Sequence, residues 1–442
     1  MDLCQTRLQT TSALFVLCLV ILFPRVGLSQ EDATQALRKQ LGEIQNQLKN
    51  ALDRIDQLEK EKSTSSGKID QLESATSARL GQVEKSLQGV QSAPSTFNPA
   101  IGMVIDATAE HLGKAGGNFN FRAAELGLSA SVDPYARAYA FINGNNNGVE
   151  VEEAAMFTTS LPWNLTAKGG RFFADFGRLP KYHQDALPFV NFPLSIDRMI
   201  GGESQADGAE LYYLFPTPFF LRATFGGYNK IGAENEQVDN LKPRSASRFT
   251  YMGRLNTYFD LTDNHSIELG SSLAYTPSVR LQGDASGGDR ILGGVDLTYR
   301  YQPLASTLYQ GFTWGSEFYN NSQRFPVDVE VPNEDDPSIL ETRTVGKRQQ
   351  SYGGYSYVDL KLNKNWSTGF LFDYAPVVDN PRQRTLSYSP YLTWYLSEFN
   401  RLRFQYSYLS NNFKADKALN GNQFFVQWTT VIGVDTHGFR VR

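Results

Sequence analysis

From about residue 100 onward, the chain is a succession of short segments in which apolar and polar residues alternate. About sixteen such segments can be counted, each close to the roughly 9–11 residues of a tilted membrane-spanning strand. In residues 124–132, for example, Leu126 and Leu128 fall on one face and Glu125 and Ser129 on the other, because successive strand side chains point to opposite faces. The pattern predicts an all-β domain.

The polar face of these segments distinguishes a soluble β-sandwich from a membrane barrel. It consists mostly of Ser, Thr, Gly, Gln and Tyr, which suits a water-filled lumen, whereas the outer face of a sandwich is rich in Lys, Glu and Asp. Short turns, such as those at 133–134 and 216–218, alternate with longer polar loops. We therefore predict a transmembrane barrel of about sixteen antiparallel strands. With an even number of strands, the first strand begins and the last strand ends on the short-turn, periplasmic side. A soluble sandwich is the alternative.

Residues 1–29 have the pattern of a secretory signal peptide. An apolar run, Ser12–Phe23, is followed by small residues up to Ser29, where we expect cleavage. An uncleaved membrane anchor is the alternative, although the run is shorter than the roughly 20 residues that a spanning helix needs. Both cysteines, Cys4 and Cys18, lie in this segment, so the mature chain would contain none.

Residues 30–90 carry a heptad pattern that predicts an α-helical coiled-coil stem in the periplasm. Leu and Ile are mixed at the core positions, which leaves a trimer open. A single amphipathic helix packed on the barrel, or a hairpin folded at 63–67, are the alternatives. We assign 91–99 to a linker and 100–442 to the barrel. The predicted core positions are Leu37, Leu41, Ile44, Leu48, Ile55 and Leu58.

The third long loop, residues 177–207, joins the fifth and sixth predicted strands. In sixteen-stranded porins the corresponding loop folds into the barrel and sets the pore width. The prolines and apolar residues of 187–194 suit a segment packed on an inner wall, and a surface loop over the mouth is the alternative. The predicted constriction residues are Arg178, Lys181, His183, Asp185, Asp197 and Arg198.

Charges on the predicted lumen face are close to balance. The principal predicted wall residues are Glu125, Arg137, Arg222, Arg254, Glu268 and Arg300. Arg403 adds one further positive charge, and Glu210, Asp296 and Asp359 add three negative charges. We therefore expect the pore to discriminate weakly between anions and cations.

Catalysis has little support in the sequence. Glu152 and Glu153 should point to opposite faces of a strand and so form no carboxylate pair. Of the histidines, only His183 lies in a plausible site. Its one neighbouring candidate ligand is Asp185, and we expect no metal centre and no cofactor from this pair. The net charge of -4 and the lack of basic clusters argue against nucleic-acid binding. The remaining histidines, expected in loops or turns, are His111, His265 and His437.

The stretch VEVEEAAMF at 149–157, with residues 167–202 after it, resembles a family of predicted bacterial outer-membrane proteins. Its members are often labelled TonB-dependent receptors, sometimes zinc-related, and often show two histidines in this loop. This chain has His183 and, two positions on, Asp185. A receptor of this kind needs a plug domain, for which the helical stem leaves no room.

The order of signal peptide, coiled coil and barrel is similar to that of DcaP-like trimeric porins and, more loosely, of phosphate-selective porins. The resemblance implies a homotrimeric porin in the outer-membrane lipid of a Gram-negative-type bacterium, with passive diffusion of small hydrophilic solutes and no enzymatic activity. A plug-less receptor or substrate-specific, metal-related channel is one alternative. A structural barrel that contacts the cell wall through its stem is the other.

Overall fold

The computed structural model describes residues 99–232, 245–279, 288–303, 309–332, 340–415 and 419–434, together with Lys49 and Arg54, which are helical and exposed. The chain separates into two units, Met1–Pro94 and Ser95–Arg442. The predicted signal peptide, the six core positions of the stem and His437 lie outside the described residues.

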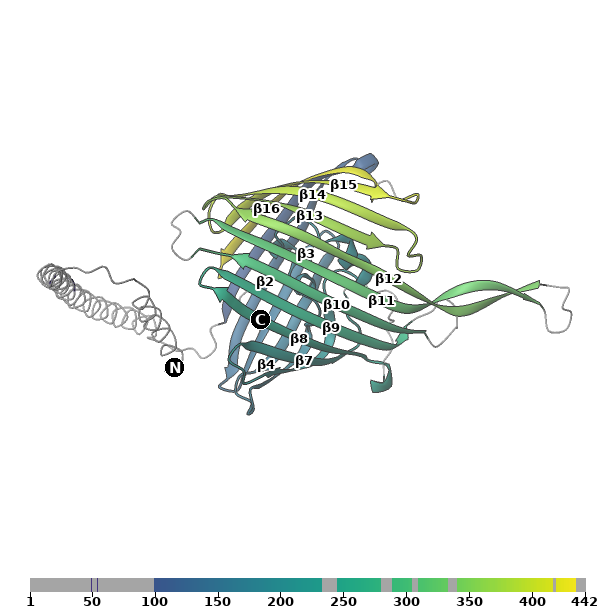
Figure 1. Ribbon diagram of the computed structural model, residues 1–442, viewed down its shortest axis with the longest axis horizontal. Helices are drawn as coiled ribbons and strands as arrows, with labels where there is room; N and C mark the ends of the chain where they lie inside the picture. Colours follow the sequence, from purple (N-terminus) through teal and green to yellow (C-terminus); the bar gives the residue numbers. More distant parts are fainter. Residues whose placement is uncertain are drawn as a thin grey trace, which may run out of the picture. The chain divides into compact units, whose positions relative to one another are not determined.

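Sixteen strands form one closed barrel, which confirms the predicted fold class (Figure 1). Each strand pairs antiparallel with its neighbours in the chain, and β16 closes the barrel on β1, with Gly433 opposite Gly102 and Gln423 opposite Leu112. The strands are β1 (Ala100–Leu112), β2 (Gly117–Asp133), β3 (Ala136–Asn145), β4 (Gly148–Thr158), β5 (Leu165–Phe173), β6 (Gln205–Leu214), β7 (Phe220–Tyr228), β8 (Thr250–Thr262), β9 (His265–Val279), β10 (Gly288–Tyr301), β11 (Gly311–Pro332), β12 (Leu340–Lys361), β13 (Trp366–Pro376), β14 (Arg384–Tyr395), β15 (Asn400–Asn411) and β16 (Gly421–Gly433).

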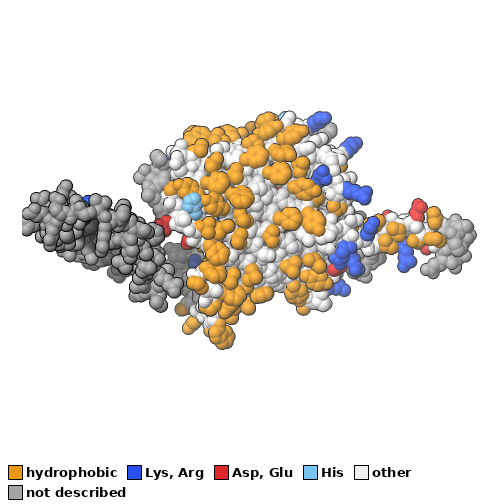
Figure 2. All heavy atoms as spheres, in the orientation of Figure 1, with side chains coloured by type: hydrophobic (Ala, Val, Ile, Leu, Met, Phe, Trp, Pro, Cys, Tyr) orange, Lys and Arg blue, Asp and Glu red, His pale blue; other side chains and the backbone are white. Residues whose placement is uncertain are grey.

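The alternation of the sequence separates an apolar outer face from a polar inner one. Glu125 and Ser129 are buried on the inside of β2, whereas Val132 is 56% exposed. Leu273 and Val295 are also more than half exposed on the barrel, and Figure 2 shows apolar side chains covering the wall. A wall with many exposed apolar side chains suits lipid rather than water. Within the described part of the chain, no helix has the length and apolar character to cross a membrane.

The hairpin of β11 and β12 extends beyond the barrel at the long-loop end (Figure 1). The pairing of β11 with β10 stops at Gln323 and that of β12 with β13 begins at Gly354, but β11 and β12 remain paired as far as Pro332 and Leu340. Lys and Arg side chains gather around this end in Figure 2. The long-loop end of the barrel thus carries both this extended hairpin and a group of basic side chains.

A β-bulge interrupts the alternation of β4. Phe141 pairs with Glu153 but Ile142 pairs with Val151, so Glu152 is the extra residue. Glu152 and Glu153 are both buried, at 8% and 1% exposure, and both contact His183 inside the barrel. The prediction that they face opposite sides was wrong, because an extra residue shifts the alternation by one position.

The segment between β5 and β6, residues 174–204, lies inside the barrel, and we call it the inner loop. It contains the short helices η2 (Leu179–Lys181), η3 (Gln184–Ala186) and α3 (Leu194–Met199). Its apolar side chains form a core within the polar lumen, where the Phe189 ring packs edge-on against the tyrosines of β12 and β14. The inner-loop residues of this core that are at most 1% exposed are Ala174, Phe176, Leu187, Phe189, Ile196, Met199 and Ile200.

Candidate functional site

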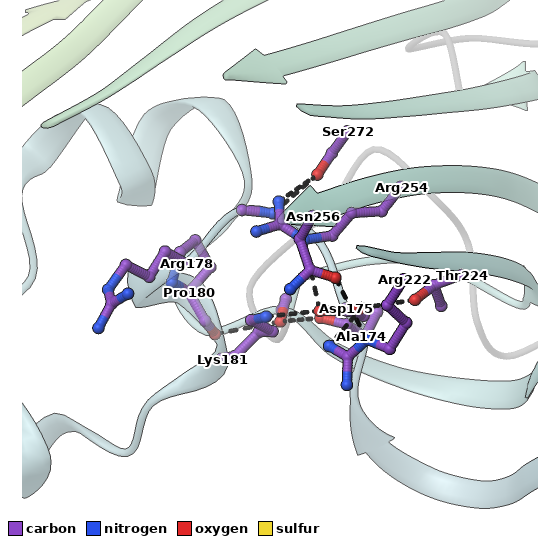
Figure 3. A network of polar contacts seen from close by, with 12 residues as sticks. Ala174, Asp175, Arg178, Pro180, Lys181, Arg222, Thr224, Arg254, Asn256 and Ser272 are labelled. Atoms are coloured by element: carbon purple, nitrogen blue, oxygen red, sulfur yellow. Dashed lines mark hydrogen bonds and ion pairs between the residues drawn. The ribbon is translucent and has the colours of Figure 1, made fainter. Parts of the chain in front are cut away.

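The inner loop is attached to the barrel wall at Asp175, directly after β5 (Figure 3). The carboxylate lies 2.5 Å from Lys181 Nζ, 3.2 Å from Arg222 Nη2 and 3.5 Å from Arg254 Nε. The Thr224 hydroxyl also donates to it at 2.7 Å. Burial raises the pKa of Asp175, but the three cations outweigh this effect and hold it well below its usual range. The start of the loop is thus fixed by a buried ion-pair network.

A second attachment is made by Glu317 of β11, which is 4% exposed. Its carboxylate accepts hydrogen bonds from the backbone N–H groups of Leu179 at 2.6 Å and Arg178 at 3.1 Å. The hydroxyls of Tyr355 and Tyr319 donate to the same group at 2.5 and 2.7 Å. Glu317 therefore accepts hydrogen bonds from the N–H groups of the turn at Arg178 and Leu179, which would otherwise be unsatisfied.

The middle of the loop is bonded to two strands that are far apart in the sequence but are separated only by β1 and β16 in the closed barrel. The N–H of Val190 donates to Gln405 of β15 at 2.8 Å, and its carbonyl accepts from Arg122 of β2 at 2.9 Å. Further along, Arg198 of α3 donates to the Ala375 carbonyl at 2.6 Å and to the Thr385 hydroxyl at 2.9 Å. The loop is bonded to the wall along its whole length.

His183 contacts three carboxylates from the wall. Its Nε2 lies 3.0 Å from Glu153 Oε1, and its Nδ1 lies 2.5 Å from Glu125 Oε2 and 2.9 Å from Glu152 Oε2. Burial lowers the pKa of His183, but Glu125 and Glu152 outweigh it, so the net pKa lies well above the usual value. The β4 bulge creates this arrangement by turning both Glu152 and Glu153 inward.

A cavity of about 870 Å³ lies on the long-loop side of the inner loop and reaches the tip of the β3–β4 hairpin at Asn147. Its lining contains nine carboxylates against two basic side chains, Arg122 and His183. In the loop itself, burial and the nearby Glu152 raise the pKa of Glu203 well above its usual value. The nine carboxylates belong to Asp106, Glu110, Glu125, Glu150, Glu152, Asp185, Asp197, Glu203 and Asp373.

A second cavity, of about 440 Å³, lies on the short-turn side, between Phe220 near the start of β7 and Tyr258 near the end of β8. Among the described residues, it shares no lining residue with the first cavity. Five basic and three acidic side chains line it. These are Lys168, Arg178, Lys181, Arg222 and Arg300, with Glu153, Asp175 and Glu268.

The structure places the predicted constriction residues in three positions. Arg178 and Lys181 line the short-turn cavity. His183, Asp185 and Asp197 line the long-loop cavity. Arg198 is bonded to β13 and β14.

The predicted wall residues divide in the same way. Glu125 lines the long-loop cavity. Arg254 is buried beneath the inner loop, where it pairs with Asp296 at 2.6 Å. Arg137 is exposed and lies over the Phe157 ring. The remaining three, which line the short-turn cavity, are Arg222, Glu268 and Arg300.

Sequence reasoning missed the two carboxylates that hold the start of the inner loop. Asp175 lies just beyond the end of β5, and Glu317 sits at an ordinary inward position of β11, so only their partners reveal their role. The expectation that His111 and His265 lie in loops or turns was wrong, because both belong to strands. His111 is an exposed residue near the end of β1, and His265 begins β9 with its Nδ1 2.5 Å from the Tyr299 hydroxyl.

Comparison with known proteins places this chain beside one sequence relative and a group of solved barrels. No family model matches it. It is similar to a protein of Aquifex aeolicus (strain VF5) described as uncharacterized, with 31% identity over 339 residues that cover 72% of this chain and 69% of the relative.

The similarity to solved structures lies in the fold. An anion-selective porin from Comamonas acidovorans aligns with a TM-score of 0.50 and 12% identity, over 76% of this chain and 99% of the porin. The outer-membrane channel DcaP of Acinetobacter baumannii aligns with a TM-score of 0.47 and 10% identity, over 76% and 96% of the two chains. The protein has a porin-type barrel fold and belongs to the same family as the uncharacterized Aquifex aeolicus protein.

Proposed function

We propose that the protein is an outer-membrane porin that allows small hydrophilic solutes to diffuse passively across the membrane. The observation that carries this proposal is a closed barrel whose polar lumen holds a cavity on each side of the wall-anchored inner loop. Each cavity is lined by charged groups that water and hydrophilic solutes can contact. The apolar outer face supports residence in a lipid bilayer.

The proposal includes the orientation and assembly expected from the sequence. The signal peptide sends the chain across the inner membrane, the stem and short turns face the periplasm, and the long loops face outward. The heptads support a homotrimer through the stem. In this arrangement the acidic cavity opens toward the cell exterior and the basic cavity toward the periplasm.

The test is a planar-bilayer recording with purified full-length protein, compared with the same preparation after boiling in detergent. Stepwise conductance from the folded sample alone is expected, because only a closed barrel provides a continuous polar path. Swelling of liposomes in small sugars should show the same difference. Absence of conductance, together with co-sedimentation with cell wall, would instead support a structural tether and contradict the porin.

A further inference from the structure

The surroundings of His183 Nδ1 offer a metal ion two carboxylate oxygens beside the imidazole nitrogen. This nitrogen faces Glu125 Oε2 at 2.5 Å and Glu152 Oε2 at 2.9 Å. An imidazole nitrogen carries at most one proton, and a proton directed at one of these oxygens leaves the other poorly satisfied. A metal ion, in contrast, can be bound by one nitrogen and several oxygens at once.

Two buried oxygen atoms from residues that line the same cavity as His183 strengthen the argument. Glu125 Oε1 and Asn143 Oδ1 accept no hydrogen bond from any described residue, although the two side chains are only 2% and 6% exposed. Both residues line the acidic cavity. An unsatisfied buried oxygen costs about 1–3 kcal/mol, and more when it is charged. These atoms are available to a ligand that enters from the cavity.

A third ligand comes from the inner loop itself. One ligand atom each from Glu125, His183 and Asp185 lie within 4.8 Å of one another, and all three residues are buried. A bound ion with metal–ligand distances of about 2.0–2.2 Å could contact all three after small side-chain movements. The metal group would then join β2 to the inner loop.

The far side of the imidazole has the support that a metal-binding histidine needs. Nε2 lies 3.0 Å from Glu153 Oε1, so its N–H donates there, and a metal ion at Nδ1 would take the place of the proton that faces Glu125 and Glu152. Glu153 is itself held by the Tyr139 hydroxyl at 3.1 Å and by the Phe173 N–H at 3.2 Å. The orientation of the ring is therefore fixed before an ion arrives.

We infer that Glu125, His183 and Asp185 form a binding site for a divalent first-row transition-metal cation at the inner end of the acidic cavity. One imidazole nitrogen with carboxylate oxygens suits ions such as Zn²⁺, Fe²⁺, Co²⁺ and Mn²⁺ better than Ca²⁺ or Mg²⁺, which prefer oxygen alone. The excess of carboxylates in the cavity raises the local concentration of cations. Binding at this site does not require that the barrel conduct.

The experiment is a calorimetric titration of full-length folded protein in detergent with Zn²⁺, with Ca²⁺ as the comparison ion. One Zn²⁺ per chain should bind in preference to Ca²⁺. His183→Gln, Glu125→Gln and Asp185→Asn should each weaken Zn²⁺ binding about tenfold or more, because even the loss of a group that only supports a metal ligand costs about 10–100-fold. Glu110→Gln, which removes a charge from the same cavity but no ligand, should weaken it clearly less.

Two results would overturn the inference. One is the absence of stoichiometric Zn²⁺ binding to the wild-type chain. The other is an equal loss of affinity in Glu110→Gln and in the ligand variants, which would indicate diffuse attraction. If a variant fails to fold, X-ray absorption of the Zn²⁺-loaded wild-type protein decides, because the site requires nitrogen and oxygen neighbours together. Since binding and conductance are measured separately, each proposal can fail alone.

Discussion

Glu317 Oε1 lies 2.6 Å from the backbone nitrogen of Leu179, so the wall of the barrel accepts a hydrogen bond from the main chain of the inner loop. Replacing Glu317 with Ala removes this acceptor and also leaves the buried Tyr319 and Tyr355 hydroxyls without it. We expect a loss of about 3 kcal/mol in the free energy of unfolding, because each buried donor left unsatisfied costs about 1–3 kcal/mol.

Urea unfolding in lipid vesicles measures this loss, and proteolysis reports whether the inner loop is released. Glu330→Ala is the control, since Glu330 is an exposed residue of the β11–β12 hairpin and should change stability by about 0.5 kcal/mol or less. Equal stability of the two variants would show that Glu317 does not hold the loop.

The pH dependence of the loop attachment follows from Asp175. Its pKa is lowered in the folded protein because Lys181, Arg222 and Arg254 face it, while Glu210 accepts its backbone N–H. A carboxyl group whose pKa is lowered on folding stabilises the folded protein at any pH above its pKa in the unfolded chain, which is about 3.9 for Asp. This contribution is lost only as the pH falls through the pKa of the folded state. The attachment should therefore survive at about pH 4.5, where an ordinary surface ion pair has begun to weaken.

Asp175→Asn tests the same network at neutral pH. The substitution leaves Lys181, Arg222 and Arg254 without their shared carboxylate, although Arg254 keeps Asp296 at 2.6 Å. We expect a loss of about 3–5 kcal/mol, as for other buried ion pairs with one partner removed. Proteolysis of the loop at pH 7 and pH 4.5 should show protection of the wild type at both values and cleavage of the variant at both.

Gly177 is required at its position for two separate reasons. Its φ of +66° lies in the left-handed region, and an added Cβ would lie 2.6 Å from Glu317 Oε2. Gly202 has a similar φ of +80° but has nothing within 4 Å of an added Cβ. Gly202→Ala should therefore cost only the backbone term of about 1–2 kcal/mol. Gly177→Ala should cost more in urea unfolding, and equal losses would exclude the steric contribution.

Much of this architecture could be predicted from the sequence because it depends on local patterns. The period of two along β2 and the short turn at 133–134 specify which side chains face lipid, and this assignment holds for Leu126 and Glu125. The strand number follows from counting such segments. The third long loop was also recognisable, because its prolines and apolar residues are unusual for an exposed loop.

The arrangement of the site could not be predicted, because it depends on contacts between distant residues. A single extra residue in β4 brings Glu152 beside Glu153, and alternation alone gives the opposite result. Likewise, a count of charges along the strands says nothing about their height in the barrel. The near balance predicted for the lumen therefore hid the separation of an acidic cavity from a basic one.

This separation leads to a prediction for ion selectivity. Without Glu203, whose pKa is raised well above its usual value, the long-loop cavity has eight carboxylates and two basic groups. The short-turn cavity has five basic and three acidic groups. The larger acidic excess should make the pore prefer cations. Because the two cavities lie on opposite sides of the inner loop, the current should also differ between the two polarities of voltage.

Reversal potentials in a KCl gradient, and current–voltage curves of oriented single channels, test both parts. At about 0.1 M salt, cation preference and current asymmetry are expected, and both should decrease at about 1 M, where the Debye length falls to about 3 Å. Glu110→Gln combined with Glu150→Gln removes two charges from the acidic cavity, and it should lower the cation preference without closing the pore. Strong anion selectivity in the wild type would contradict the prediction, because it would mean that the basic cavity controls ion passage.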